Sequence, residues 1–251
     1  MMRRVACLVL LLVGMSPAVR AQIGFEFGVG HDTQIGDVNT ACGCTFPDGS
    51  GTGFMSAVSY EVPLFIGIRG GVKTGIEVKK TQGSVSVMES AIIQGAQSGL
   101  IDTVAQVPMK RTLDVSLTYA TVTTYMSYTI PGIGLFVQVG TAVSDLRSST
   151  FTQKRELAST SYSVGGHTLN NMRFQNGSSA ETVEDGPVPN ANTLRVAAMF
   201  STGYEIDLVP LGFGIAAMVT YDTPLTTVQS TSGSNWMISS LYGTVAVKFG
   251  L

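Results

Sequence analysis

The sequence predicts an all-β protein that forms a closed, antiparallel, up-and-down transmembrane β-barrel, most simply of eight strands. Three observations lead there. The chain begins with the features of an export signal. Apolar and polar residues then alternate, most regularly over residues 64–80, and a period of two places successive side chains on opposite faces of a strand. The connections between these segments alternate between short and long, as in transmembrane β-barrels.

Residues 1–21 have the parts of a secretory signal peptide. Arg3 and Arg4 precede an apolar run over residues 5–14, and Val19 and Ala21 fit a signal-peptidase site. The run is roughly half the length of about twenty residues that a helix needs to span a bilayer, which disfavours a retained anchor. We therefore predict cleavage after Ala21 and one barrel domain over residues 22–251.

The composition fits strands that are apolar on one face only. Charged residues make up 13% of the chain, against about 25% in ordinary soluble domains, and the mean hydropathy is +0.28. Yet no apolar run after the signal is long enough for a transmembrane helix. The apolar residues are therefore interleaved with polar ones. A net charge of −2 gives no reason to expect a nucleic-acid partner.

Eight segments carry the alternation, and we expect each to be a strand with its apolar face toward lipid and its polar face toward the lumen. They are residues 23–30, 53–62, 64–80, 113–128, 134–147, 193–206, 211–222 and 236–251. In the third segment, one face holds Ile66, Ile68, Val72, Ile76 and Val78, and the other holds Arg69, Gly71, Lys73, Gly75, Glu77 and Lys79.

Several segments exceed the 9–11 residues or so that cross a membrane, so we expect the sheet to continue above it. Residues 81–112 and 148–192 are expected to carry extra strand, and the first of them a short helix around residues 89–97. A full extra hairpin in either would raise the strand count to ten.

Three short connections each pair a tyrosine with a proline a few residues later. The pairs are Tyr60 with Pro63, Tyr128 with Pro131, and Tyr204 with Pro210. Proline cannot donate to a strand ladder and so marks a turn, and tyrosine suits the aromatic girdle at a membrane interface. Ordinary hairpin chemistry would give the same pattern. With an even strand count, both chain ends lie on this short-turn, periplasmic side.

With this signal peptide, strand pattern and alternation of turns, the chain resembles the small outer-membrane β-barrel families, both porin-like and eight-stranded OmpA/OmpX-type, over residues 22–251. Its last strand resembles the terminal signal read by the barrel assembly machinery, since Val245, Val247, Phe249 and Leu251 keep the alternate spacing. The final residue is leucine where that pattern usually has an aromatic. The resemblance implies a bacterial outer-membrane location, contact with outer-membrane lipid and lipopolysaccharide, and the assembly machinery as a partner during biogenesis.

The polar faces of the predicted strands place charges of both signs in the lumen. They are Glu26, Glu61, Arg69, Lys73, Glu77, Asp114, Arg195, Glu205 and Lys248. An eight-stranded lumen is just wide enough to be filled by side chains, and buried charges must pair, so we expect Arg69, Lys73 and Glu77 to pair with Glu26, Asp114 and Glu205. Such a network is either a salt-bridge plug or a narrow selective path lined by Arg69, Lys73 and Arg195.

Cys42 and Cys44 lie in the first long loop with one residue between them. Export favours a disulfide, although such a short spacing strains the bridge. Unbridged or intermolecularly paired thiols are the alternative, and two thiolates alone make a poor zinc site. We expect no metal and no cofactor.

The leading functional hypothesis is a non-enzymatic outer-membrane protein, either structural or a narrow porin-like channel. The rival is a surface adhesion or ligand-binding barrel that acts through residues 148–192. A third hypothesis is a lipid A-modifying enzyme. It would use a loop histidine, such as His31 next to Asp32, with one of the many serines, but the geometry that such a triad needs cannot be read from sequence.

Overall fold

The computed structural model of the chain describes residues 21–40, 44–94, 103–164, 167–208, 212–230 and 235–250. The predicted signal peptide lies outside these ranges, apart from its last residue, as do Cys42, Pro210 and Leu251. The predictions made for those residues therefore remain predictions.

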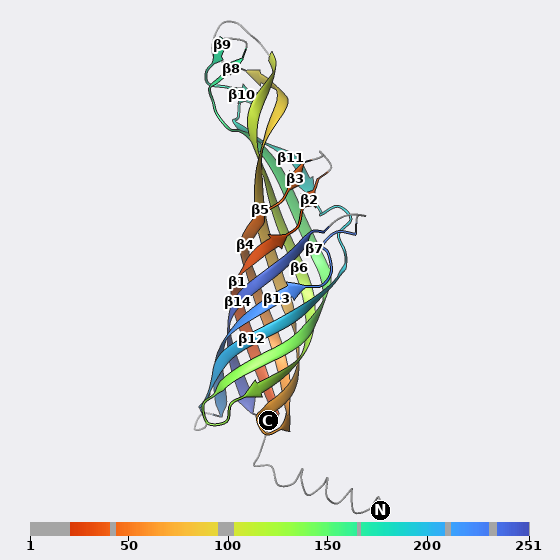
Figure 1. The fold of residues 1–251 in the computed structure, drawn as a ribbon, viewed down its shortest axis with the longest axis vertical. Coiled ribbons are helices and arrows are strands. Elements are labelled where there is room, and N and C mark those ends of the chain that lie inside the picture. Colours follow the sequence, from red (N-terminus) through yellow and green to blue (C-terminus); the bar gives the residue numbers. More distant parts are fainter. Residues whose placement is uncertain are drawn as a thin grey trace, which may run out of the picture.

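Eight long strands form one closed antiparallel ring (Figure 1), which confirms the predicted fold class. Strand β1 pairs with β14 on one side and with β4 on the other, and β6 closes the ring between β5 and β7. The eight strands are β1 (Gln22–Ile35), β4 (Gly49–Phe65), β5 (Ile68–Gln94), β6 (Thr103–Thr129), β7 (Leu135–Leu157), β12 (Leu194–Leu208), β13 (Phe213–Pro224) and β14 (Met237–Gly250).

Two of these strands are much longer than a membrane crossing requires. Strands β5 and β6 each have 27 residues and pair along nearly their whole length. Since β4 stops pairing with β5 at Gly83, the upper parts of β5, β6 and β7 leave the barrel rim as a narrow sheet. Residues 84–94, 103–112, 154–164 and 167–186 are called the stalk here, and Figure 1 shows them projecting beyond the rim.

Six short strands complete the fold on the side of the long loops. They are β2 (Val38–Asn39), β3 (Thr45–Phe46), β8 (Tyr162–Val164), β9 (His167–Leu169), β10 (Arg173–Phe174) and β11 (Ala180–Gly186). Strand β11 covers the edge of β7, and β10 pairs with the tip of β5. Strands β10 and β11 extend the main sheet, and β2 with β3 and β8 with β9 form two separate two-stranded sheets. None of the six enters the ring, so the strand count of the barrel stays at eight rather than ten.

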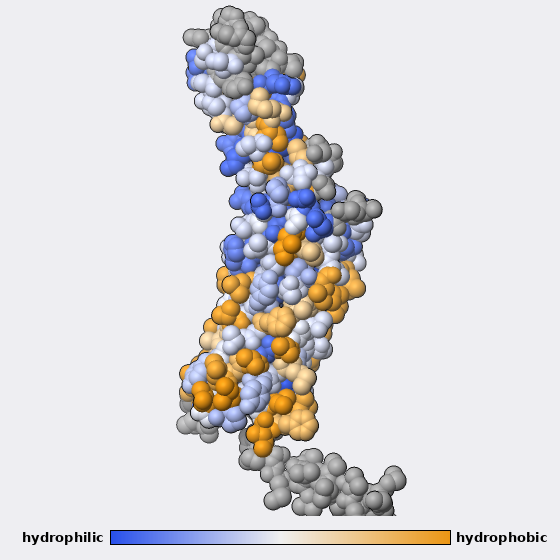
Figure 2. Space-filling model, in the orientation of Figure 1, coloured by the Kyte–Doolittle hydropathy of each residue, from blue (hydrophilic) through white to orange (hydrophobic). Residues whose placement is uncertain are grey.

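On the face shown in Figure 2, apolar side chains gather over the lower part of the barrel, and the surface above it is mostly hydrophilic; we call the lower region the apolar band. The outward side chains include Phe27, Val58, Val122, Val139 and Phe200, each exposed although strongly apolar. Burial alternates along every barrel strand, so lipid-facing and lumen-facing residues follow the period of two. Among the described residues no helix is long and apolar enough to span a bilayer.

The turns on the opposite side are tight and use glycines with positive φ. Gly67 (φ 76°) lies between β4 and β5, and Gly132 and Gly134 (φ 79° and 81°) lie between β6 and β7. Pro131 is in the second of these turns, as predicted. Pro63 is not in a turn: it pairs with Arg69 inside the sheet, next to a bulge, and the chain reverses at Ile66 and Gly67.

Two further expectations are wrong. Residues 89–94 continue strand β5, so no helix forms in that part of the predicted 89–97 segment. On upper β6 the inward face is the apolar one: Leu113, Val115 and Leu117 are buried, while Asp114 points outward and is partly exposed. The reason is the environment, because this part of β6 lies above the apolar band, where the outside of the sheet is water.

Candidate functional site

Charged side chains from four strands, joined by a tyrosine from a fifth, form a network near the periplasmic end of the lumen. Lys248 Nζ lies 3.1 Å from Glu61 Oε1 and 2.9 Å from Glu205 Oε2. Arg69 Nη1 lies 3.0 Å from Glu205 Oε1 and 3.5 Å from Glu61 Oε2. The Tyr125 hydroxyl donates to Glu61 Oε1 at 3.0 Å. Each carboxylate therefore has two cationic partners, which is how buried charge becomes tolerable.

A separate ion pair, Lys73 with Glu26, lies between this network and a second one around Lys79. Lys73 on β5 approaches Glu26 on β1 at 3.1 Å, although β4 separates the two strands in the ring. Both side chains are almost fully buried. The pair crosses part of the lumen and occupies it.

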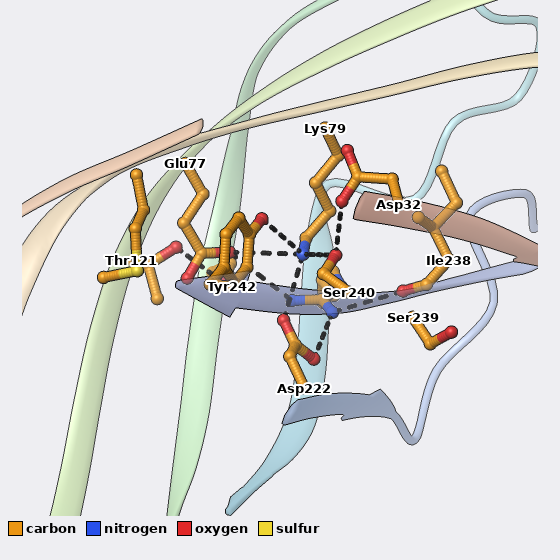
Figure 3. A network of polar contacts seen from close by, with 12 residues as sticks. Asp32, Glu77, Lys79, Thr121, Asp222, Ile238, Ser239, Ser240 and Tyr242 are labelled. Atoms are coloured by element: carbon orange, nitrogen blue, oxygen red, sulfur yellow. Dashed lines mark hydrogen bonds and ion pairs between the residues drawn. The ribbon is translucent and has the colours of Figure 1, made fainter. Parts of the chain in front are cut away.

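The second network, shown in Figure 3, centres on Lys79, whose side chain is fully buried. Its ammonium donates to Asp222 Oδ2 at 3.0 Å, to Ser240 Oγ at 2.6 Å and to the Tyr242 hydroxyl at 3.2 Å. Arg195 Nη2 donates to Asp222 Oδ1 at 2.6 Å. Asp222 on β13 thus holds two cations, Arg195 from the neighbouring strand β12 and Lys79 from β5 across the lumen.

The network continues toward the rim through Ser240. Its hydroxyl donates to Asp32 Oδ1 at 2.5 Å, and Asp32 Oδ2 accepts the backbone N–H of Lys80 at 2.7 Å. Glu77 Oε2 lies 3.7 Å from Lys79 and 3.8 Å from Arg195. The Ser240 hydroxyl thus donates to the Asp32 carboxylate and accepts from the Lys79 ammonium, so it links these two side chains.

Glycines make room for the tyrosines of these layers. Tyr125 pairs across the sheet with Gly71 on β5 and with Gly140 on β7. A Cβ atom at Gly71 would overlap the Tyr125 ring, and one at Gly140 would lie 2.8 Å from the Tyr125 Cβ atom. At the upper layer, a Cβ at Gly30 would lie 2.5 Å from the Tyr242 ring. The inward glycines thus let aromatic rings lie against the wall and fill the lumen.

An apolar cluster closes the barrel above the second network. Leu113, Leu117 and Tyr119 contribute from β6, and Phe46 and Trp236, both fully buried, contribute from the loop side. The remaining buried members are Val38, Val115, Phe151, Val188, Val228 and Ile238. We call this cluster the apolar plug. Tyr119 joins it to the charges below, since the Arg195 guanidinium lies 5.9 Å from its ring centroid.

Most of the charged side chains of the lumen are almost fully buried, which leaves them closely packed. A cavity of about 10 Å³ lies against Lys73, Glu77, Thr121 and Thr123, among others, which is room for about one water molecule. The lumen is therefore packed by side chains, as expected for eight strands.

The stalk has a small core of its own. Val107, Met109, Leu157, Met172 and Phe174 are buried together on one face of the sheet. Arg155 links that face to the edge: it pairs with Glu181 of β11 and with Glu89 of β5, and its guanidinium lies 5.1 Å from the Phe174 ring centroid. The stalk is thus a packed extension rather than a set of loops.

Eight of the nine charges predicted to face the lumen lie there. Arg69 and Lys73 each contact one of the three candidate partners, Glu205 and Glu26 respectively. Glu77 instead lies near Lys79 and Arg195. Asp114 does not belong to the network, because its side chain is on the outer face of β6.

Sequence reasoning left Asp32, Lys79 and Asp222 out of the network. Alternate residues of a strand face inward, and each of these three residues is in that set. Asp32 is two residues after Gly30, and Asp222 is two residues after Thr220. Asp32 lies two residues beyond the end of its predicted strand, whereas Asp222 is the last residue of its predicted strand, so the alternation reaches both. Lys79 was assigned to the polar face but was not counted among the network residues.

The remaining candidate residues lie apart from the network. Tyr60, Tyr128 and Tyr204 point outward near the short turns, each more than 40% exposed, where an interfacial girdle would be. His31 and Asp32 face opposite sides of β1, outward and inward, so they do not form a catalytic pair. Cys44 precedes β3 and Cys42 is outside the described ranges, so their disulfide stays a prediction. No group of three or more metal-ligating side chains occurs within the ranges given above.

A closed antiparallel ring with apolar side chains outside and paired charges inside is the architecture of a transmembrane β-barrel, because lipid can cover only a surface without open strand edges or unpaired charges. The protein is an outer-membrane β-barrel protein of the small, eight-stranded class. This confirms the location predicted from the sequence.

No protein-family model matches the sequence, and no curated protein matches it either. Among solved structures, the chain is similar to Neisserial surface protein A, at 8% identity over 91% of this chain and 97% of that one, with a TM-score of 0.35. It is also similar to the attachment invasion locus protein Ail of Yersinia pestis in complex with the heparin analogue sucrose octasulfate, at 11% identity over 92% and 99%, TM-score 0.30. A third is CarO2 of Acinetobacter baumannii, at 12% identity over 89% and 98%, TM-score 0.31. These likenesses concern the barrel fold alone.

Proposed function

We propose that this protein is a non-conducting outer-membrane barrel that holds a rigid stalk outside the cell for binding at the cell surface. The observation that carries the proposal is the continuation of β5, β6 and β7 beyond the rim into a sheet with its own core, above a lumen packed with ion pairs.

The lumen supports the non-conducting half of the proposal. An ion crossing it would have to displace Lys248, Lys73 and Lys79 from their carboxylate partners and then pass the apolar plug. Separating buried ion pairs and dewetting an apolar constriction both oppose conduction.

Planar bilayer recordings test this half. Purified protein is expected to give no conductance steps above the lipid background. Stable, ion-selective steps that Arg69→Ala abolishes would overturn the proposal and favour the narrow selective path along Arg69, Lys73 and Arg195.

The stalk supports the surface-binding half. A structural barrel needs only tight turns at its rim, yet here the extension buries a second apolar cluster and pairs its charges across three strands. Loops and extensions held on a rigid scaffold are where binding residues concentrate.

A stalk-deleted variant tests this half: residues 86–110 and 154–186 are each replaced by a short Asn-Gly turn. Heat-modifiable migration in gels checks that the barrel still folds. Cells that display the variant are expected to lose attachment to protein- or glycan-coated surfaces that the full chain supports. Attachment that survives removal of the stalk, or a full chain that supports none, would contradict the proposal. Because the proposal includes no enzymatic step, lipid A mass spectra should also stay unchanged on overexpression.

A further inference from the structure

The stalk carries a polar pocket that none of the packing described so far explains. Its volume is about 410 Å³, within the range of about 300–1,000 Å³ typical of small-molecule sites. Three hydroxyls (Thr160, Ser178, Ser179), two amides (Asn171, Asn176) and one guanidinium (Arg173) line it, together with Met172 and Gly177. No carboxylate is among the lining residues.

The walls of the pocket are fixed by anchors in the stalk core. Met172 and Phe174 are buried against Met109 and Leu157, and they alternate with Asn171 and Arg173, which point outward. The backbone N–H of Met172 donates to Thr160 O at 2.9 Å, and that of Phe174 to Ser178 O at 2.8 Å. The pocket is therefore formed before any ligand arrives, which lowers the entropic cost of binding.

The turn beside the pocket is equally ordered. Gly177 adopts a positive φ of 77° and its N–H donates to Phe174 O at 2.8 Å, while the Asn176 side chain accepts the N–H of Ser178 at 2.8 Å. Arg173 Nη1 donates to Gly177 O at 3.0 Å, which places the guanidinium at the pocket.

Arg173 differs from the other arginines of the described chain. Arg69, Arg111, Arg147, Arg155 and Arg195 each have a carboxylate partner. Within the same ranges, Arg173 makes no ion pair, and its side chain is exposed. A guanidinium has five N–H donors in a planar fork suited to a carboxylate or sulfate, and the hydrogen bond to Gly177 uses one of them.

We propose that this pocket binds an anionic sugar, with the carboxylate or sulfate on Arg173 and the ring hydroxyls on the surrounding amides and hydroxyls. The lining is hydrogen-bonding throughout except at Met172 and Gly177, so a polyhydroxylated ligand matches it better than an apolar one does. This inference names a ligand class for the surface binding proposed above, and it rests on that proposed function.

The experiment is isothermal titration calorimetry on the full chain in detergent micelles. The probes are glucuronate, glucose and acetate. Glucuronate and glucose differ in the carboxylate, whereas acetate carries the charge without the hydroxyls. We expect glucuronate to bind at least about tenfold more tightly than either of the other two.

Two variants separate a built site from general charge attraction. Arg173→Ala is expected to weaken glucuronate binding by about tenfold or more, since it removes the charge-assisted contact. Arg147→Ala, an exposed arginine near the rim paired with Asp145, should leave it unchanged. Folding of both is checked by the gel shift.

Several results would overturn the proposal. They are no detectable binding of glucuronate, equal binding of glucose, equal binding of acetate, or no effect of Arg173→Ala. None of them bears on whether the barrel conducts or whether removing the stalk abolishes attachment, so a failure of the sugar site is distinguishable from a failure of the proposed function.

Discussion

Lys79→Met removes a fully buried ammonium from the upper lumen network while keeping a side chain of similar length. The ammonium lies 3.0 Å from Asp222 and 3.7 Å from Glu77, and at an effective dielectric constant of about 20 each attraction amounts to about 5 kcal/mol. The desolvation of the ammonium and its repulsion from Arg195 offset part of this sum. We expect the free energy of unfolding to fall by about 3–5 kcal/mol, the usual result of removing one partner of a buried ion pair, because Asp222 and Glu77 then share Arg195 alone.

Urea unfolding in detergent micelles measures this change, followed by the fluorescence of Trp236, the single tryptophan of the chain. Arg147→Ala is the control, because its pair with Asp145 is largely exposed and should contribute less than about 1 kcal/mol. The double variant Lys79→Met with Asp222→Asn should lose less than the sum of the two single changes, since both remove the same pair. A Lys79→Met variant as stable as the Arg147→Ala control would refute the view that the network holds the barrel.

Three further changes test the packing. Gly71→Ala should destabilise the barrel by about 1–3 kcal/mol because its methyl group overlaps the Tyr125 ring, and the double variant with Tyr125→Ala should lose less than the sum of the two single changes in the same urea assay. Trp236→Ala should cost about 3–5 kcal/mol, read as a lower temperature for the gel shift; an unchanged temperature would mean that the plug adds no stability. Val139→Arg, which places a charge on the lipid face, should cost about 2–4 kcal/mol in lipid bilayers, and a neutral effect there would contradict the assigned apolar band.

The sequence determined the strand faces inside the membrane, because the period of two is a local property of the extended backbone. Phe27, Val139 and Phe200 point to lipid as predicted, and Glu26, Lys73 and Arg195 point to the lumen. The pocket on the stalk could not be predicted in this way, since its lining residues belong to short, irregular segments that have no periodicity to read.

Only the tertiary structure decided which charges meet and where the inside of the sheet becomes apolar. Arg69 and Glu205 are 136 positions apart, and it is the closure and register of the ring that bring them together. The alternation correctly separates Leu113 and Asp114 onto opposite faces of β6. It does not show whether the outer face meets lipid or water, so the predicted orientations of the two side chains are reversed. Within the bilayer the outer face meets lipid, whereas above it the outer face meets water, so on upper β6 the apolar side chains turn inward to form the plug.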